Sequence, residues 1–354
     1  MARRAVLAMR SDGNMTISHM NDAAHSNSEA LSSPGGATTA LGLCLVGYGS
    51  IAECHMQAFR EIQTVRPTVL VGRLAGPTAD FADQWGFDRH TLDLDEALTD
   101  KSVDVVVITS PNDLHAPQAD KALRAGKHVL LEIPIAMSLD DARRLTRLSR
   151  EVDRHLMVCH TKRFMPALRE VQRRVSEDRL HILQMVGFFG ILRHTNTSWT
   201  GRKRSWTDNI LWHHAAHLVD LALWTTGCSE AQDVQCRFGP EHPTQKVMDM
   251  SLSMAIPGGI VATINLSYNF RGFLERMLFI GQEETLLYDH GALIDGEGKQ
   301  IMPAESITGL GSQNREFISA VVEGRDPAVT GEQVLPCMEV LHKAQEAAER
   351  ACRT

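Results

Sequence analysis

A short apolar run followed by a glycine-rich turn constrains this chain more than any other feature. Leu41 to Val46 has the composition of a strand buried on both faces, and it leads directly into Gly47-Tyr48-Gly49-Ser50-Ile51-Ala52. In this G-x-G-x-x-A pattern the first glycine permits a tight turn, the second lets a pyrophosphate approach the backbone, and the small Ala52 lets the following helix pack closely. The pattern predicts a strand, a turn and a helix whose N-terminus binds the phosphates of a dinucleotide.

The residue after the next apolar run bears on the type of dinucleotide. Thr68 to Val71 is the second predicted strand, and Gly72-Arg73 follows it, where NAD-binding chains usually have Asp or Glu for the ribose 2′-hydroxyl. A guanidinium suits a 2′-phosphate instead, because it forms paired, charge-assisted hydrogen bonds. We therefore expect NADP as the preferred cofactor, with NAD as the second choice. A solvated Arg73 at a helix start is the alternative interpretation.

The alternation of strands and helices continues toward residue 160. Strands are expected over 103–109 and 128–131, and helices over 54–63, 78–85 and 116–125. A repeated strand–helix pattern predicts a parallel sheet, and such sheets bind ligands at the carboxyl ends of their strands. Those ends supply the remaining candidate cofactor-binding residues, which are Ser110, Pro111, Asn112, His115, Glu132, Ile133 and Pro134.

In the second half, apolar and polar residues alternate with the two-residue period of strands that bury one face and expose the other. Met248 to Met254 and Ile260 to Tyr268 alternate apolar and polar residues on either side of Pro257-Gly258-Gly259, which predicts a hairpin. With further strands over 182–189 and 277–280, we expect a mostly antiparallel open sheet packed on a helix over 213–225.

These patterns predict an α/β protein of two domains with additional terminal segments. We expect a Rossmann dinucleotide-binding domain over 41–160 and an α+β substrate and oligomerisation domain over 161–330. A helix over 331–354 should return to the first domain. Residues 1–40 are rich in Ser, Asn, Gly and Ala without apolar periodicity, which predicts a disordered tail.

Composition excludes several classes of function. A formal net charge of -7 argues against a nucleic-acid-binding surface, and no apolar run approaches the roughly 18 residues that cross a bilayer. The seven cysteines are scattered without C-x-x-C pairs, so neither a disulfide framework nor a zinc ribbon is indicated. We expect a cytoplasmic protein whose partners include no nucleic acid and no membrane.

Three histidines within five residues form the strongest catalytic candidate. In Trp212-His213-His214-Ala215-Ala216-His217, a helix would place His213 and His217 on one face. Imidazole titrates near pH 6.5 and is well suited to act as a general base. The pair could also hold zinc, but the glutamate of H-E-x-x-H is missing and no third ligand is evident, so we expect no metal. Ordinary core or surface histidines are the alternative.

Basic residues near the histidines indicate an acidic substrate. Arg163 and Arg204 are the first candidates to clamp a dicarboxylate, because guanidinium binds carboxylate with two parallel bonds. Other candidate substrate-binding residues are His160, Lys162, Arg202, Trp206 and Trp212, with Phe164 as a further lining residue. A solvated basic loop and an ordinary aromatic core are the alternatives.

Several of these strings resemble a known family in their order. Gly47-x-Gly49-x-x-Ala52, Ser110-Pro111 with His115, Gly126-Lys127-His128 and Glu132-x-Pro134 resemble the glucose-fructose oxidoreductase, inositol dehydrogenase and rhizopine catabolism family. The resemblance covers nearly everything after residue 40. Second-half strings, namely His160 to Phe164, Arg204 to Asp208, Trp212 to His217 and Met248 to Ser251, are similar to family members of aromatic-acid degradation.

The resemblance implies an activity and an assembly. It implies NADP-linked oxidation of a cyclic hemiacetal dicarboxylate to a pyrone dicarboxylate in protocatechuate 4,5-cleavage. His217 takes the position of the family's catalytic histidine, and His213 would orient the substrate or share the proton. Family members cover the open sheet with a second subunit, so a homodimer or larger homo-oligomer is implied.

Two departures from the family pattern count against a sugar substrate. Sugar-oxidising members carry Glu-Lys-Pro, and this chain has Ile133 in place of the lysine. Those members also commonly have Asp at the position of His213. A sugar, polyol or aromatic dihydrodiol dehydrogenase nevertheless remains an alternative. A non-catalytic NADP-binding sensor and a metal-dependent hydrolase are further alternatives.

Overall fold

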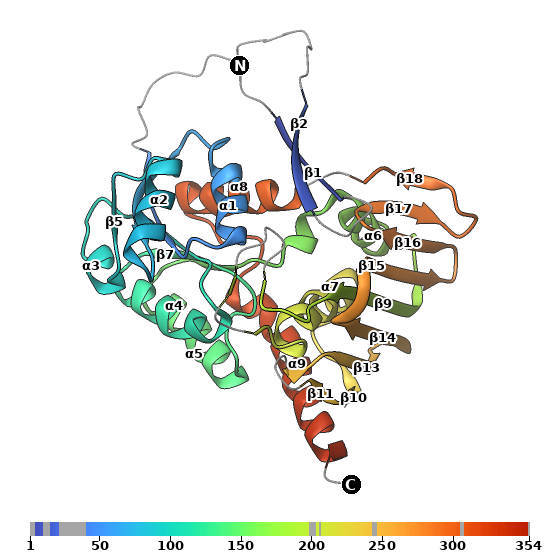
Figure 1. The fold of residues 1–354 in the computed structure, drawn as a ribbon. Coiled ribbons are helices and arrows are strands. Elements are labelled where there is room, and N and C mark those ends of the chain that lie inside the picture. The colour runs from blue at the N-terminus through green and yellow to red at the C-terminus, as the bar shows by residue number, and fades with distance from the viewer. Residues whose placement is uncertain are drawn as a thin grey trace.

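The computed structural model describes residues 4–9, 15–20, 40–197, 203–204, 207–242, 246–304 and 308–352. Two sheets with helices around them lie side by side, and the chain crosses between them more than once (Figure 1). In this part of the chain no helix is both long and apolar enough to cross a bilayer.

The first domain is built on a six-stranded parallel sheet in the order β5-β4-β3-β6-β7-β8. Its strands are β3 (Leu41–Val46), β4 (Val65–Val71), β5 (Arg89–Thr91), β6 (Val105–Ile108), β7 (His128–Leu131) and β8 (Leu156–Val158). The chain runs outward in both directions from β3 and β6, which places the topological switch point between these two strands. The structure confirms the expected parallel sheet and the Rossmann fold of the first domain.

Five helices pack around this sheet. They are α1 (Ser50–Phe59), α2 (Ala75–Trp85), α3 (Leu94–Leu98), α4 (His115–Arg124) and α5 (Leu139–Glu151). Three of them, α1, α2 and α4, overlap the predicted ranges 54–63, 78–85 and 116–125, whereas α3 and α5 were not predicted. Local signals fix several ends: Asp93 and Ser138 cap α3 and α5 through side-chain oxygens, and Gly86 ends α2 in the left-handed conformation.

The second domain has an eight-stranded sheet in the order β10-β13-β14-β9-β15-β16-β17-β18. Its strands are β9 (Ile182–Leu192), β10 (Gln232–Phe238), β13 (Asp249–Ile256), β14 (Ile260–Ser267), β15 (Asn269–Gly281), β16 (Thr285–Asp289), β17 (Ala292–Asp295) and β18 (Gln300–Met302). Every neighbouring pair is antiparallel except β14 with β9. The hairpin predicted at Pro257-Gly258-Gly259 joins β13 to β14.

One face of this sheet packs against helix α7 (Ala216–Thr226), which follows a single π-helical turn, η3 (Leu211–Ala215). Inward-facing Met250, Leu252 and Met254 of β13 are buried, as the alternation predicts. Before this sheet come the short helix η2 (Thr161–Phe164) and α6 (Pro166–Ser176). β11 (Glu241–His242) and β12 (Lys246–Val247) form a separate two-stranded sheet between β10 and β13 in the sequence.

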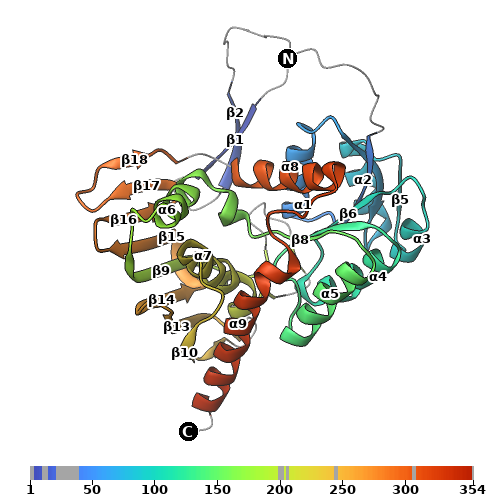
Figure 2. The same cartoon turned by 180° about the vertical axis from the view of Figure 1, so that it is seen from behind.

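The C-terminal helices join the two domains. Helix α8 (Thr308–Glu323) packs against α1 of the first domain, although we expected residues up to 330 to belong to the second. Helix α9 (Gly331–Cys352) packs on α5 of the first domain and on α7 and β10 of the second (Figure 2). The chain therefore returns to the first domain before residue 330.

Residues 4–9 and 15–20, within the segment expected to be disordered, form an antiparallel pair, β1 (Arg4–Met9) with β2 (Met15–Met20). The expected disordered tail therefore needs correcting over these two strands, where pairing of one strand with the other supplies the regular structure.

Candidate active site

The turn after β3 fits a dinucleotide. Gly47 has a φ of 107°, and a Cβ there would lie 2.7 Å from Oγ1 of Thr109, so only glycine suits this position. A Cβ on Gly49 would meet nothing within 4 Å, which leaves room above the turn. Helix α1 begins at Ser50 without a side-chain cap on Gly49, so its first N–H groups can bind a pyrophosphate. Tyr48 and Ile51 are half-buried beside them.

Arg73 stands where the sequence predicts it, directly after β4 and one residue before the cap of α2. Its side chain is exposed at the carboxyl edge of the sheet. This position suits a contact with the ribose end of a dinucleotide whose pyrophosphate lies at Gly49.

His115 shapes two strand-end turns and does not reach a ligand directly. Its Nδ1 lies 2.8 Å from the carbonyl of Pro134 and its Nε2 lies 2.9 Å from that of Ser110, and the residue is only 1% exposed. Burial lowers the pKa of this imidazole. The expected cofactor contact of His115 is therefore corrected to a bridge between the turn after β6 and the cis Ile133–Pro134 peptide after β7.

Asn112 connects this edge to the second domain. It lies at the start of the short helix η1 (Asn112–Leu114), and its Nδ2 donates to the carbonyl of Ile133 at 2.9 Å. The same Nδ2 lies 3.3 Å from Nδ1 of His213. His213 is thus held against the strand ends that are expected to bind the cofactor, where Ser110 and Pro111 are half-buried.

Glu132 is paired from within the first domain. Nε2 of the buried His55 lies 2.9 Å from Oε1 of Glu132, and Nδ1 of His55 lies 3.1 Å from Oδ1 of Asn314 on α8. Burial alone would raise the pKa of Glu132, but the hydrogen bond with His55 lowers it. The carboxylate therefore stays charged next to the turn that carries Ile133.

His217 lies among other basic groups on the second domain's side of the same edge. Its ring meets that of His160, which follows β8, edge to face with centroids 6.3 Å apart. Desolvation, followed by the charge of Lys162, holds the pKa of His217 well below its usual value. Its Nδ1 is buried and has no hydrogen-bond partner among the residues that the structure describes, which is unusual for a buried polar atom. A neutral imidazole of this kind can accept a proton from a ligand.

His160 and Lys162 each have an acidic partner. Nδ1 of His160 lies 3.2 Å from Oδ2 of Asp220, and burial lowers the pKa of His160 to about 4. Lys162 is buried and pairs with Glu275 of β15, beside the ring of Tyr288. The cluster therefore combines neutral imidazoles with a fixed ammonium group.

Arg163 does not have the predicted role. Its Nε and Nη2 donate to the two carboxylate oxygens of Asp220 at 2.9 and 2.5 Å, and Nη2 also donates to the carbonyl of Gln333 at 3.1 Å. The fork that was expected to bind a substrate carboxylate is thus already filled by a carboxylate of the protein. The sequence misled here because Asp220 is distant along the chain and comes within reach only when α7 packs beside η2.

A second basic group surrounds His213. Arg193 and Arg204 both contact Asp208, at 2.5 and 3.2 Å, so two guanidinium groups share one buried carboxylate. Burial would raise the pKa of Asp208, but His213 and the two arginines lower it. Two guanidinium groups therefore lie next to His213 and share Asp208, which makes this group the better candidate for binding a ligand carboxylate.

His214 is occupied within the protein. Its Nδ1 lies 2.6 Å from the hydroxyl of Tyr268, and its ring stacks on Phe189 with centroids 4.3 Å apart. Trp212 and Phe164 are buried, at 6% and 7% exposure. Arg202 and Trp206, both predicted to bind substrate, lie outside the described residues.

Sequence reasoning missed several residues of the site, among them His55, Arg193, Asp208, Asp220 and Glu275. Asp220 follows His217 by three residues on one helix, a spacing that could have revealed it. Arg193, at the end of β9, has no local signal of this kind.

Among the residues that the structure describes, two groups of possible metal-ligand atoms form at this edge, although we expected no metal. His55, Glu132 and Cys159 form one group and Asp208, His213 and His214 the other, with the ligand atoms of each group within 4.8 Å of one another. In both groups hydrogen bonds or ion pairs within the protein already engage several of these atoms.

Comparison with known proteins agrees with this geometry. Residues 41–160 match a family described as "Oxidoreductase family, NAD-binding Rossmann fold", and residues 166–305 match "Bacterial oxidoreductases, C-terminal". A 4-carboxy-2-hydroxymuconate-6-semialdehyde dehydrogenase of Sphingobium sp. is 35% identical over 87% of this chain and 99% of its own length. A D-xylose dehydrogenase of Paenarthrobacter nicotinovorans is 26% identical over 65% of this chain and 64% of its own.

Solved structures share the fold. A levoglucosan dehydrogenase in complex with NADH and levoglucosan is similar with a TM-score of 0.77 at 19% identity, covering 88% of this chain and 97% of that one. A UDP-N-acetylglucosamine 3-dehydrogenase of Acidithiobacillus ferrooxidans has a TM-score of 0.76 at 21% identity, covering 88% and 98%. With the glycine turn, the strand order and the 35% identical relative, the chain belongs to the glucose-fructose oxidoreductase, inositol dehydrogenase and rhizopine catabolism family of NAD(P)-dependent oxidoreductases.

Proposed function

We propose that this enzyme oxidises the cyclic hemiacetal of 4-carboxy-2-hydroxymuconate-6-semialdehyde to 2-pyrone-4,6-dicarboxylate with NADP. The observation that carries the proposal is the gathering of arginine and lysine side chains around neutral imidazoles at the carboxyl edge of the first sheet. A dicarboxylate with a hydroxyl to be oxidised needs both features. The 35% identity to a dehydrogenase named for this semialdehyde supports the same substrate.

The residues divide the chemistry between them. Arg193 and Arg204 would bind one substrate carboxylate. Lys162 would bind the other, because its ammonium group has three N–H donors and the pair with Glu275 uses one of them. His217 would take the hydroxyl proton of the hemiacetal, because its imidazole is neutral and its Nδ1 has no hydrogen-bond partner among the described residues. The C–H bond of the same carbon breaks, and a bound nicotinamide dinucleotide supplies the acceptor for the hydride. The products are a lactone, reduced cofactor and one proton.

Arg73 supports NADP over NAD. A solvent-exposed guanidinium after β4, in the position that NAD-binding chains usually fill with an acid, can pair with a 2′-phosphate.

We also propose a homodimer whose interface includes the open face of the eight-stranded sheet, with a second copy as the occupant. Leu183 of β9 and Val261 of β14 are 53% and 48% exposed on neighbouring strands. Large exposed apolar side chains on a sheet favour an interface. Light scattering should show that the wild-type protein is a dimer and that Leu183→Glu is a monomer. A monomeric wild-type protein would refute the proposed dimer.

The substrate assignment is tested by turnover. Purified enzyme should reduce NADP with the enzymatically generated semialdehyde, and chromatography should identify the pyrone dicarboxylate as product. Levoglucosan, D-xylose, inositols and aromatic dihydrodiols form the comparison panel. A higher kcat/KM for any of these than for the semialdehyde would overturn the proposal in favour of a sugar, polyol or dihydrodiol dehydrogenase.

A further inference from the structure

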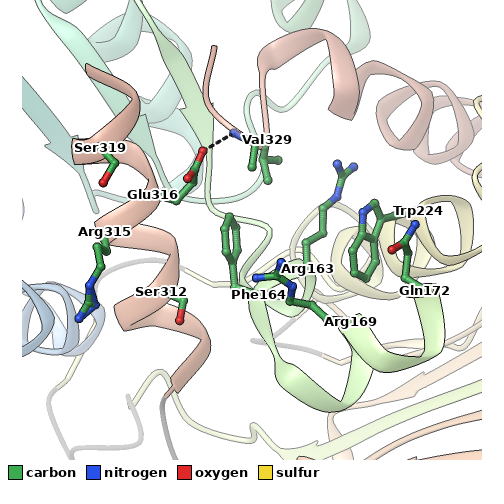
Figure 3. Close-up of a pocket in the computed structure, with 11 residues that line it drawn as sticks. Arg163, Phe164, Arg169, Gln172, Trp224, Ser312, Arg315, Glu316, Ser319 and Val329 are labelled. Atoms are coloured by element: carbon green, nitrogen blue, oxygen red, sulfur yellow. Dashed lines mark hydrogen bonds between the residues drawn. The ribbon is translucent and has the colours of Figure 1, made fainter. Parts of the chain in front are cut away.

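A cavity of about 400 Å³ lies between α8, the η2–α6 segment and α7, and none of the reactions discussed above uses it. Its lining includes Arg163, Phe164, Arg169, Trp224, Ser312 and Glu316. Figure 3 shows Arg163 and Arg169 extending from the η2–α6 segment, with Trp224 and Gln172 beside them and α8 on the opposite side. Three arginines, with Arg315 of α8 as the third, and two aromatic rings thus border one space.

The charges around the cavity do not cancel. Arg163 is neutralised by Asp220. Glu316 is neutralised by Arg325, which donates to both of its oxygens at 2.6 and 2.9 Å. The guanidinium of Arg169 has no hydrogen-bond or ion-pair partner in the part of the chain that the structure describes, so a positive charge remains at the cavity.

Arg163 also has hydrogen-bonding capacity left for a ligand. Nε and Nη2 are used by Asp220 and Gln333, whereas Nη1 donates to none of the described residues. The side chain is only 9% exposed. A charged donor that is largely enclosed and borders a cavity favours an anionic occupant, because charge-assisted hydrogen bonds are stronger where few water molecules compete for them.

The aromatic residues select among anions. Phe164 is buried and Trp224 is half-buried, and both border the space next to the arginines. A flat apolar ring can contact these side chains while its carboxylates reach Arg169 and Nη1 of Arg163.

We propose that this cavity is a second binding site, for a small aromatic carboxylate, separate from the histidine cluster. It is joined to that cluster by a short chain of contacts. Arg163 borders the cavity and holds Asp220, Asp220 lies 3.2 Å from His160, and His160 meets the ring of His217. An occupant that contacts Arg163 is therefore two side chains from His160.

The test uses isophthalate as the probe and the full chain saturated with NADP. Titration is followed by tryptophan fluorescence, and Trp224→Phe identifies the part of the signal that comes from the cavity. Arg169→Ala should raise the Kd of that signal by about tenfold or more, since it removes a charge-assisted contact. The matched control is Arg147→Ala, an exposed arginine of α5 outside the cavity, which should leave the Kd unchanged.

Two further arms separate this site from the proposed substrate site and from simple anion binding. Arg193→Met should leave the Trp224 signal intact even if it abolishes turnover, so loss of the signal in that variant would assign the binding to the active site and overturn the proposal. An unchanged Kd in Arg169→Ala, or no Trp224 signal in wild type, would also overturn it. Inorganic phosphate should bind more weakly than isophthalate, and equal or tighter binding would refute the aromatic carboxylate.

Discussion

The two halves of the active site are built from different parts of the polypeptide. On the side of the first domain, backbone and small residues form the surface: Gly47 and Gly49, the start of α1, and the turn at Ile133–Pro134. On the side of the second domain, charged and titratable side chains such as His217, Lys162 and Arg193 form it.

This difference separates a general task from a specific one. Backbone N–H groups at a strand–helix turn bind a pyrophosphate in the same way in many enzymes. Side chains from η2, α7 and the end of β9 can change without disturbing that turn, and they therefore decide the substrate. Mutations in one half should accordingly leave the function of the other half largely intact.

Replacing His217 should give the largest difference between the two halves, with a strong loss of catalysis and little change in cofactor binding. His217→Ala is expected to lower kcat by about 10²- to 10⁴-fold, because the general base is lost. Cofactor affinity, measured by fluorescence titration, should change little, since the glycine turn is untouched. His90→Ala, an exposed histidine of β5, is the matched control and should keep full activity. Loss of NADP binding in His217→Ala would show that the halves are not separable.

The buried histidines should make stability sensitive to acid. His160 has a pKa lowered to about 4, mainly by burial, whereas it regains the ordinary value near 6.5 in the unfolded chain. Above pH 6.5 both states are neutral. As the pH falls toward 4 the unfolded state alone takes up the proton, so up to about 3 kcal/mol of the free energy of unfolding is lost.

Urea unfolding at a series of pH values measures this slope. His160→Gln should flatten it between about pH 6.5 and 4. A slope identical to that of wild type would contradict the low pKa of His160 and place the acid sensitivity elsewhere.

Arg193 should affect the substrate and not the cofactor. Arg193→Met keeps a long side chain but removes the charge, and kcat/KM for the semialdehyde should fall roughly 10- to 100-fold. The Kd for NADP should remain within about twofold of wild type. Steady-state kinetics and a cofactor titration on the same preparation measure the two effects. A loss of NADP affinity without a loss of kcat/KM for the semialdehyde would show that Arg193 contacts the cofactor and not the substrate.

Replacing Arg73 should give the smallest effect, and it should change the binding of the cofactor and not that of the substrate. Arg73→Ala is expected to lower the preference for NADP over NAD by roughly tenfold, because one paired contact to the 2′-phosphate is lost. The KM for the semialdehyde should stay constant. Arg66→Ala, an exposed arginine at the start of the same strand, is the control. An unchanged cofactor preference would show that Arg73 is solvated.

Sequence could predict the first half far better than the second, for a physical reason. The glycine turn and the buried strands of the first domain are local features, each determined by residues adjacent in the chain, and in the second domain the hairpin at Gly258 is a feature of the same kind. The short strands β5 and β8 were not predicted, because three residues are too few to show a period.

The second half depends on contacts between distant segments. Arg163 was predicted to bind substrate and instead holds Asp220, a pair separated by 57 residues. Arg193 and Asp208 form an ion pair although neither is a sequence neighbour of the other. His213 and His217 were predicted from their spacing and from the family resemblance, and a π-helical turn at His213 precedes the α-helix that carries His217.

A crystal structure of the enzyme with NADP and 2-pyrone-4,6-dicarboxylate tests the central claim most directly. We predict the pyrophosphate at the start of α1, the lactone within hydrogen-bonding distance of His217, and one product carboxylate against Arg193. A ligand bound at the strand ends with His217 turned away from it, or with both carboxylates in solvent, would contradict this division of the site.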